Sequence, residues 1–129
     1  MVGITNSRSC DSLDTDFGKF TLFRVVGFFD VATHSRLPFG QFTLKVIDIG
    51  NGEFQASPNV FVFNSTTQCI EHVCGVGNSV EGALLSAINM LMSEVTKQEA
   101  NKPDQDLDES DFVWLNWQPY VQLTMPPTH

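Results

Sequence analysis

Alternation of apolar and polar residues dominates the first half of the chain and predicts β-strands. Residues 20–29 are aromatic and β-branched, as strands are, with apolar side chains at even and odd positions alike. A strand with this pattern is either covered on both faces or carries a bulge at Gly27. In residues 41–46 the alternation is strict, which predicts one buried face and one face in water.

Turn residues separate these strands from several more. Asn51-Gly52 is a strong hairpin signal and leads into a strand at 53–63 that a proline interrupts. A short strand is predicted at 68–74, and the aromatic segments 112–117 and 120–124 predict one or two final strands. Successive strands joined by short turns predict an antiparallel meander.

One long helix is predicted over residues 79–97. Asn78 or Ser79 can cap it, because their side chains accept hydrogen bonds from the first helical N–H groups. The helix must pack on one face of the sheet, since nothing else in the chain could cover the apolar stripe of the helix. The fold class is therefore α+β, an antiparallel meander of about five strands with one long helix on one face. The apolar stripe of the helix is Val80, Leu84, Ala87, Leu91 and Val95.

The length of 129 residues indicates one domain. Residues 1–16 are rich in Ser, Asp and Asn and predict a flexible N-terminal arm, whereas 17–125 predict a single domain that includes an acidic linker at 98–111. Three cysteines are an odd number, and the N-terminus has no apolar run of signal-peptide length. Both features indicate the cytoplasm, where thiols stay reduced.

Negative charge is concentrated in the acidic linker. The whole chain has a formal net charge of −8, and residues 98–111 hold six acidic residues and one lysine, a net −5. So acidic a composition argues against nucleic acid and anionic membrane surfaces as direct partners. Two interpretations of the linker stay open: a solvated surface loop, or an acidic patch for a protein partner with a basic surface.

The second interpretation gives seven candidate partner-binding residues. Tight protein interfaces often combine a Trp or Tyr anchor with a charged rim. If the linker is extended, alternate aspartates project to one side about 6.6 Å apart. The candidates are Asp104, Asp106, Asp108, Glu109, Asp111, Trp114 and Trp117.

Three segments carry parts of known chemical motifs, and each part is incomplete. Asp104-x-Asp106-x-Asp108 matches the start of a calcium loop but lacks its central glycine and final glutamate. Cys69-x-x-His72-x-Cys74 lacks the second ligand pair of a zinc site, and Gly75-x-Gly77 lacks the remaining residues of a phosphate-binding loop. We therefore expect no metal, no cofactor and no catalytic residue.

The stretch Gly75-Val-Gly-Asn-Ser-Val-Glu-Gly-Ala-Leu-Leu-Ser-Ala-Ile88 resembles the strand-to-helix step of HicB-type antitoxins. In that family a glycine precedes a Ser or Thr cap, and Glu-x-Ala-Leu opens a helix that packs on a small sheet. Glu81-Gly-Ala-Leu84 follows this pattern. The resemblance covers these fourteen residues and carries over no site residue.

These features favour a small acidic cytoplasmic protein that binds and neutralises a protein partner and has no enzymatic activity. Immunity proteins, antitoxins and phage-encoded inhibitors of bacterial defence nucleases share this profile, and some of them would act by mimicking nucleic acid. One alternative is a small-molecule-binding or enzymatic domain with a Phe-lined pocket and His34 or His72 as its polar group. The other is a structural or assembly subunit that self-associates, for example as a homodimer.

Overall fold

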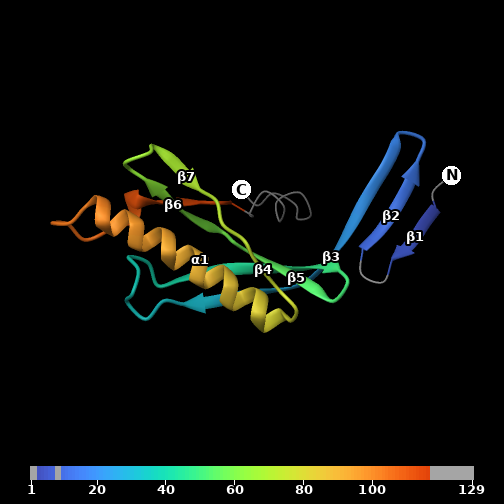
Figure 1. The fold of residues 1–129 in the computed structure, drawn as a ribbon, viewed down its shortest axis with the longest axis horizontal. Helices are drawn as coiled ribbons and strands as arrows, with labels where there is room; N and C mark the ends of the chain where they lie inside the picture. The colour runs from blue at the N-terminus through green and yellow to red at the C-terminus, as the bar shows by residue number, and fades with distance from the viewer. Residues whose placement is uncertain (1–2, 8–9, 117–129) are drawn as a thin grey trace, which may run out of the picture.

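The computed structural model describes residues 3–7 and 10–116, with side chains from Ser12 onward. The described residues form nine strands, one long α-helix and one short 3-10 helix (Figure 1). All strand pairs are antiparallel, and the helix lies across one face of the sheet. The predicted α+β class is therefore confirmed.

The strands belong to two sheets instead of one. The predicted strand at 53–63 divides at Asn59, immediately after Pro58, and its two halves pair with different neighbours. Asn59 occupies the division, where its side chain accepts a hydrogen bond from the backbone N–H of Thr43 at 2.9 Å. The larger sheet runs in the order β1 (Gly3–Ser7), β2 (Cys10–Thr15), β3 (Gly18–Ala32), β4 (Gln41–Gly50), β5 (Glu53–Pro58) and β8 (Gly75–Gly77). The smaller sheet runs β7 (Cys69–Glu71), β6 (Val60–Asn64), β9 (Phe112–Trp114).

Strands also form in the region for which we predicted an arm. β1 pairs with β2, and β2 pairs with the first half of β3, which adds two strands to the five or so that were expected. Together these strands extend away from the part of the molecule that carries the helix (Figure 1). Pairing describes the backbone and not its motion, so the flexibility of residues 1–16 stays a prediction.

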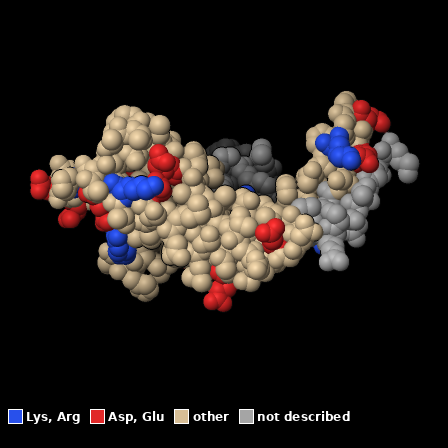
Figure 2. All heavy atoms as spheres, in the orientation of Figure 1, with Lys and Arg blue, Asp and Glu red and all other residues tan. Residues whose placement is uncertain are grey.

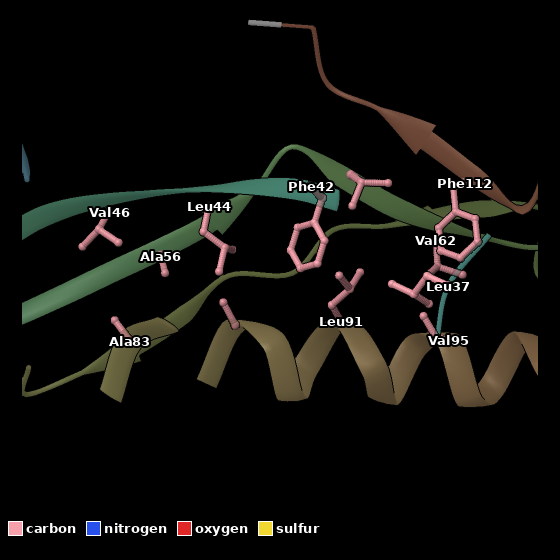
Figure 3. Packing of buried hydrophobic residues seen from close by; sticks show 12 residues of the cluster. Leu37, Phe42, Leu44, Val46, Ala56, Val62, Ala83, Leu91, Val95 and Phe112 are labelled. Atoms are coloured by element: carbon pink, nitrogen blue, oxygen red, sulfur yellow. The ribbon is translucent and has the colours of Figure 1, made fainter. Parts of the chain in front are cut away.

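Helix α1 (Val80–Asn101) begins where the sequence predicts and ends four residues later than expected. Ser79 is the N-cap, and its hydroxyl accepts a hydrogen bond from the backbone N–H of Gly82 at 2.9 Å. The helix packs on β4, β5, β6 and β8. Its predicted apolar stripe faces the sheet, where Leu91 and Val95 pack among the buried residues of the strands (Figure 3). Burial of this stripe holds the two layers together.

Strand β8 approaches α1 so closely that only glycine fits. A Cβ atom on Gly75 would meet the backbone nitrogen of Ala87 and would lie 2.7 Å from the carbonyl oxygen of Ala83. A Cβ on Gly77 would lie 2.6 Å from the backbone nitrogen of Ala83. The helix contributes small alanines at these positions. Backbone is therefore packed against backbone at this contact, and larger side chains on either element would separate the layers.

We expect Gly75→Ala to lower the free energy of unfolding by about 1–3 kcal/mol, because the added methyl group must push α1 away from the sheet. Chemical denaturation measures this loss. Gly40→Ala is the matched control, since a Cβ there has no atom within 4 Å, and we expect a change within about 0.5 kcal/mol. Equal stability of the two variants would contradict the close contact.

Candidate functional site

Strand β3 and the turn before it expose a set of large apolar side chains. Phe17 is 93% exposed and Phe28 is 60% exposed, values that are unusual for phenylalanine in a folded domain. The bulge predicted near Gly27 is confirmed, because the register with β4 shifts between Val25 and Gly27. The alternative prediction, that both faces of this strand are covered, is wrong. We call the exposed set the β3 apolar surface: Phe17, Phe20, Leu22, Phe23, Val25, Val26, Phe28 and Phe29.

This exposure follows from the position of the helix. α1 packs on β4, β5, β6 and β8, so it covers one face of the sheet and leaves the β3 apolar surface exposed. A single helix cannot cover both faces of a sheet. This exposure could have been predicted from the sequence, because residues 20–29 are apolar at even and odd positions alike and only one helix is predicted to cover them.

The backbone of β3 is also incompletely paired. Residues 18–23 pair with β2 and residues 24–32 pair with β4, and neither half has a second partner among the described strands. Each half of β3 therefore pairs with a described strand along one of its two edges. An exposed apolar edge of this length is a template for pairing with another chain.

The acidic linker forms a compact loop at the opposite end of the molecule from β1 and β2 (Figures 1 and 2). Residues 98–101 belong to α1, so the loop proper starts at Lys102. A turn closed by the backbone N–H of Gln105 and the carbonyl of Lys102 follows, which means that the alternate aspartates do not form one extended row. The exposed carboxylates of this acidic loop are Asp104, Asp106, Asp108 and Glu109.

Asp108 begins the short 3-10 helix η1 (Glu109–Asp111) as its N-cap. Its carboxylate accepts hydrogen bonds from the backbone N–H and the hydroxyl of Ser110, and the backbone N–H of Asp108 donates in return to Asp111 at 2.8 Å. The hydrogen bonds from Ser110 lower the pKa of Asp108. This capping box fixes the conformation of the loop where it returns to the sheet.

Asp111 differs from the other candidates because it is buried, with 4% exposure. Its carboxylate forms an ion pair with Lys102 at 2.9 Å and accepts a hydrogen bond from the side chain of Gln98 at 2.9 Å. Burial raises the pKa of Asp111, but the hydrogen bonds from Gln98, Asp108 and Lys102 outweigh burial, so the net effect is a lowered pKa. Asp111 is therefore almost completely enclosed and anchors the acidic loop.

Gln98 is the residue that sequence reasoning missed. It is 1% exposed at the end of the helical stripe, and its carbonyl oxygen accepts a hydrogen bond from the backbone N–H of Ser65 at 3.0 Å. Its amide nitrogen donates to Asp111. One glutamine thus joins α1 to the loop after β6 and to η1. A polar residue at an apolar helix position was the only signal for it in the sequence.

Trp114 is half-exposed at the end of β9, with 41% of its surface in solvent. Its ring packs edge-on against Phe39, with the two ring centroids 4.9 Å apart. Phe39 packs in the same way on the buried Phe112, with the ring centroids 5.0 Å apart. Trp114 is thereby fixed in place with one side open to solvent. Trp117 and the predicted strand at 120–124 lie outside the described residues.

The histidines and cysteines of the described residues do not gather into a metal site. No group of three or more His, Cys, Asp or Glu residues that could hold a metal ion occurs within residues 3–7 and 10–116. The ring of His72 packs against that of Phe61, with the two ring centroids 4.6 Å apart. Cys69 and Cys74 are exposed free thiols. His34 lies in the loop after β3 with a positive φ of 50°.

A cavity of about 370 Å³ lies beside that loop, between Arg36 and the C-terminal part of α1. The ion pair between Arg36 and Glu99, at 3.3 Å, forms part of its wall. No phenylalanine lines this cavity, and buried side chains fill the space between sheet and helix (Figure 3). It therefore differs from the Phe-lined pocket of the enzymatic alternative.

Comparison with models of known protein families, with curated proteins and with solved structures finds no match to this chain. The part of the chain that the structure describes includes no helix with the length and hydropathy to cross a membrane.

We expect Asp111→Asn to lower the free energy of unfolding by about 1–3 kcal/mol at neutral pH, because Lys102 loses its charged partner. The folded-state pKa of Asp111 is lowered, so its stabilising effect is complete above the unfolded pKa of about 3.9 and is lost as the pH falls through the folded value. Urea unfolding of wild type and variant from neutral to acidic pH measures both effects.

The wild type should lose more stability than Asp111→Asn between neutral pH and acid, so that the two unfolding curves converge at low pH. Asp104→Asn is the control, since Asp104 is exposed, and its stability should stay within about 0.5 kcal/mol of wild type at neutral pH. A constant difference between wild type and Asp111→Asn at every pH would contradict the role assigned to the carboxylate.

Proposed function

We propose that the protein acts by binding another protein chain and not by catalysis, with the β3 apolar surface as its principal contact. The observation that carries this proposal is the exposure of eight large apolar residues on one strand and its preceding turn. Monomeric proteins rarely expose contiguous apolar patches of more than a few hundred Å², and larger ones mark interaction sites. Each half of the same strand pairs with a described strand along one edge only, and sheet edges are a common place for another chain to bind.

The size of this surface fits a specific interface. Scaled from about 200 Å² for a whole aromatic side chain, the exposed fractions amount to roughly 800 Å², which is close to the share of one partner in a standard interface. Covering that area would contribute on the order of 20 kcal/mol before the costs of association are subtracted. Exposure to water has no comparable benefit for the folded chain.

The acidic loop gives a second candidate surface. Asp104, Asp106 and Glu109 are exposed, and the anchor of Asp111 on Lys102 fixes the loop that carries them. A protein with a basic surface fits this arrangement, and carboxylates so placed would speed its association. Such a partner could be a toxin or a nuclease that this protein neutralises in the cytoplasm, as immunity proteins, antitoxins and phage-encoded anti-defence inhibitors do.

We expect the double variant Val25→Lys/Phe28→Lys to lose protein partners that the tagged wild-type chain retains in affinity capture, because charges would enter the apolar contact. The matched control is Leu85→Lys/Met90→Lys, which places the same charges at exposed apolar positions on the outer face of α1. Control and wild type should retain the same partners. Equal capture by all three proteins would contradict the proposal.

We expect Asp104→Lys/Asp106→Lys/Glu109→Lys to slow association with a captured basic partner at least tenfold at low salt, by reversing the field of the loop. Asp108 and Asp111 are left unchanged because they hold the loop together. Stopped-flow or surface-based kinetics at two ionic strengths measures the rate. Asp14→Lys/Glu53→Lys/Glu81→Lys, at three exposed positions remote from the loop, makes the same change in net charge and is the control. Equal association rates and salt dependence for the two variants would contradict a role of the loop.

A further inference from the structure

We propose that the cavity beside the acidic loop receives an arginine side chain from a protein partner with a basic surface. This inference rests on the proposed function and names the group that the second candidate surface binds. The cavity has a volume of about 370 Å³, near the lower end of the range for sites that enclose small organic groups. Its lining comes from the loop after β3 (Ser35, Arg36, Leu37 and Pro38), from α1 (Val95 and Glu99) and from the acidic loop (Asp106 and Leu107).

Part of the cavity wall is apolar. Val95 and Leu37 are buried members of the core cluster between sheet and helix. Leu107 is partly buried and packs against the same cluster from the acidic loop. An aliphatic chain that lies on these side chains leaves water without burying a polar group. The methylene groups of a long basic side chain form such a chain, and its charged end stays near the polar part of the wall.

Two carboxylates and one guanidinium supply the charge of the lining. Arg36 and Glu99 pair with each other at nitrogen–oxygen distances of 3.3 and 3.4 Å, and their side chains are about half-exposed. The Asp106 carboxylate makes no hydrogen bond or ion pair with the residues that the structure describes. Because the charges of Arg36 and Glu99 cancel, Asp106 leaves the lining with a net charge of −1.

This charge selects a cation. An anion in the cavity would face Asp106 and the other exposed carboxylates of the acidic loop, whereas a cation is attracted to them. Lysine and arginine both carry a positive charge on an aliphatic stem, but a guanidinium is more weakly hydrated and enters a cavity at a lower cost. Its five N–H donors also allow it to bind Asp106 and Glu99 together, because the pairing of Glu99 with Arg36 is long for a charged hydrogen bond.

Both loops that line the cavity are held in place. In the loop after β3, the backbone N–H of Arg36 donates to the carbonyl of Thr33, and that of Thr33 donates to the carbonyl of Gly40, at 3.0 Å each. The acidic loop is held by the ion pair of Lys102 with Asp111. A cavity whose walls are fixed before binding loses less conformational entropy than one that forms around its ligand.

The first test is the binding of a Gly-Arg-Gly tripeptide, blocked at both ends, to the full chain, followed by NMR chemical shifts. We expect saturable binding with the largest shifts at Leu37, Val95 and Leu107. The tripeptide with citrulline, which has nearly the same shape and no charge, should bind at least about tenfold more weakly. The lysine tripeptide should bind several-fold more weakly than the arginine one. No saturable binding of the arginine tripeptide, or equal affinity of either other peptide, overturns the proposal.

Asp106→Asn should weaken binding of the arginine tripeptide about tenfold, because the cavity loses its uncompensated charge. Asp104→Asn is the matched control, since it removes the same charge from the same loop at a position outside the cavity lining. We expect it to change the affinity by less than about twofold. Both side chains are exposed, and circular dichroism checks that both variants are folded. Equal effects of the two substitutions would show attraction to the loop as a whole and overturn the cavity as the binding site.

A free alkylguanidine distinguishes a side chain of a protein from a small molecule. n-Butylguanidine has an aliphatic stem and the same head group as arginine but no peptide backbone. We expect it to bind no more tightly than the arginine tripeptide. Binding that is tighter by about tenfold or more would identify a site for small molecules and overturn the assignment to a protein partner.

Kinetics with a captured partner separate failure of this inference from failure of the proposed function. Asp106→Asn should raise the dissociation rate about tenfold and leave the association rate within about twofold, since a contact inside a cavity acts after encounter. A partner that is lost in Val25→Lys/Phe28→Lys but binds Asp106→Asn with wild-type rates overturns the inference and leaves the proposed function in place. Capture that is unaffected by Val25→Lys/Phe28→Lys overturns the proposed function, and the tripeptide titration then decides for or against the cavity independently.

Discussion

The close contact between β8 and α1 is the constraint on which the rest of this structure depends. Glycines at 75 and 77 let the backbone of β8 lie directly against the alanines of the helix. That contact sets where α1 starts and the line it follows across β4, β5 and β6. The position of the C-terminal end of the helix, with Gln98 and Lys102, follows from the same line.

Both candidate surfaces are consequences of that position. At its C-terminal end α1 delivers Gln98 and Lys102 to Asp111, which determines the conformation of the acidic loop. Away from the acidic loop, the helix leaves the β3 apolar surface exposed. Figure 2 shows acidic side chains at the end that carries the loop and also in the middle of this face.

The sequence predicts those elements whose pattern is local. The strict alternation at 41–46 and the stripe of α1 each record one buried face, and both predictions are confirmed. The interruption of the strand at Pro58 was predicted, but the change from one sheet to another at that point was not, because it is decided by distant pairing with β4, β7 and β9. The burial of Asp111 was missed for a similar reason, since its partner Gln98 lies thirteen residues away on another element.

The same limit explains the interpretation of residues 20–29. Apolar residues at both parities indicate that neither face of the strand is suited to water, but they do not show whether the cover comes from the same chain. The acidic segment was visible from composition alone, and its division into exposed and anchoring carboxylates required the fold. Local patterns thus locate the strand and the loop, whereas long-range packing decides which side chains are presented.

β3 pairs with β2 along its first part and with β4 along the rest, and this arrangement affects how β1 and β2 can move. Among the described strands, β3 is the one whose pairing joins β1 and β2 to the rest of the larger sheet, and the register shift between Val25 and Gly27 lies just beyond the last residue paired with β2. From that shift to Gly18 the strand extends about 25 Å at roughly 3.3 Å per residue. A rotation of about 10° at the bulge would therefore displace the far end of the strand by about 4 Å. The bulge is thus placed where a hinge would move β1 and β2 relative to the rest of the sheet. A chain bound along residues 24–32 would lie directly beside this bulge and would restrict such a rotation.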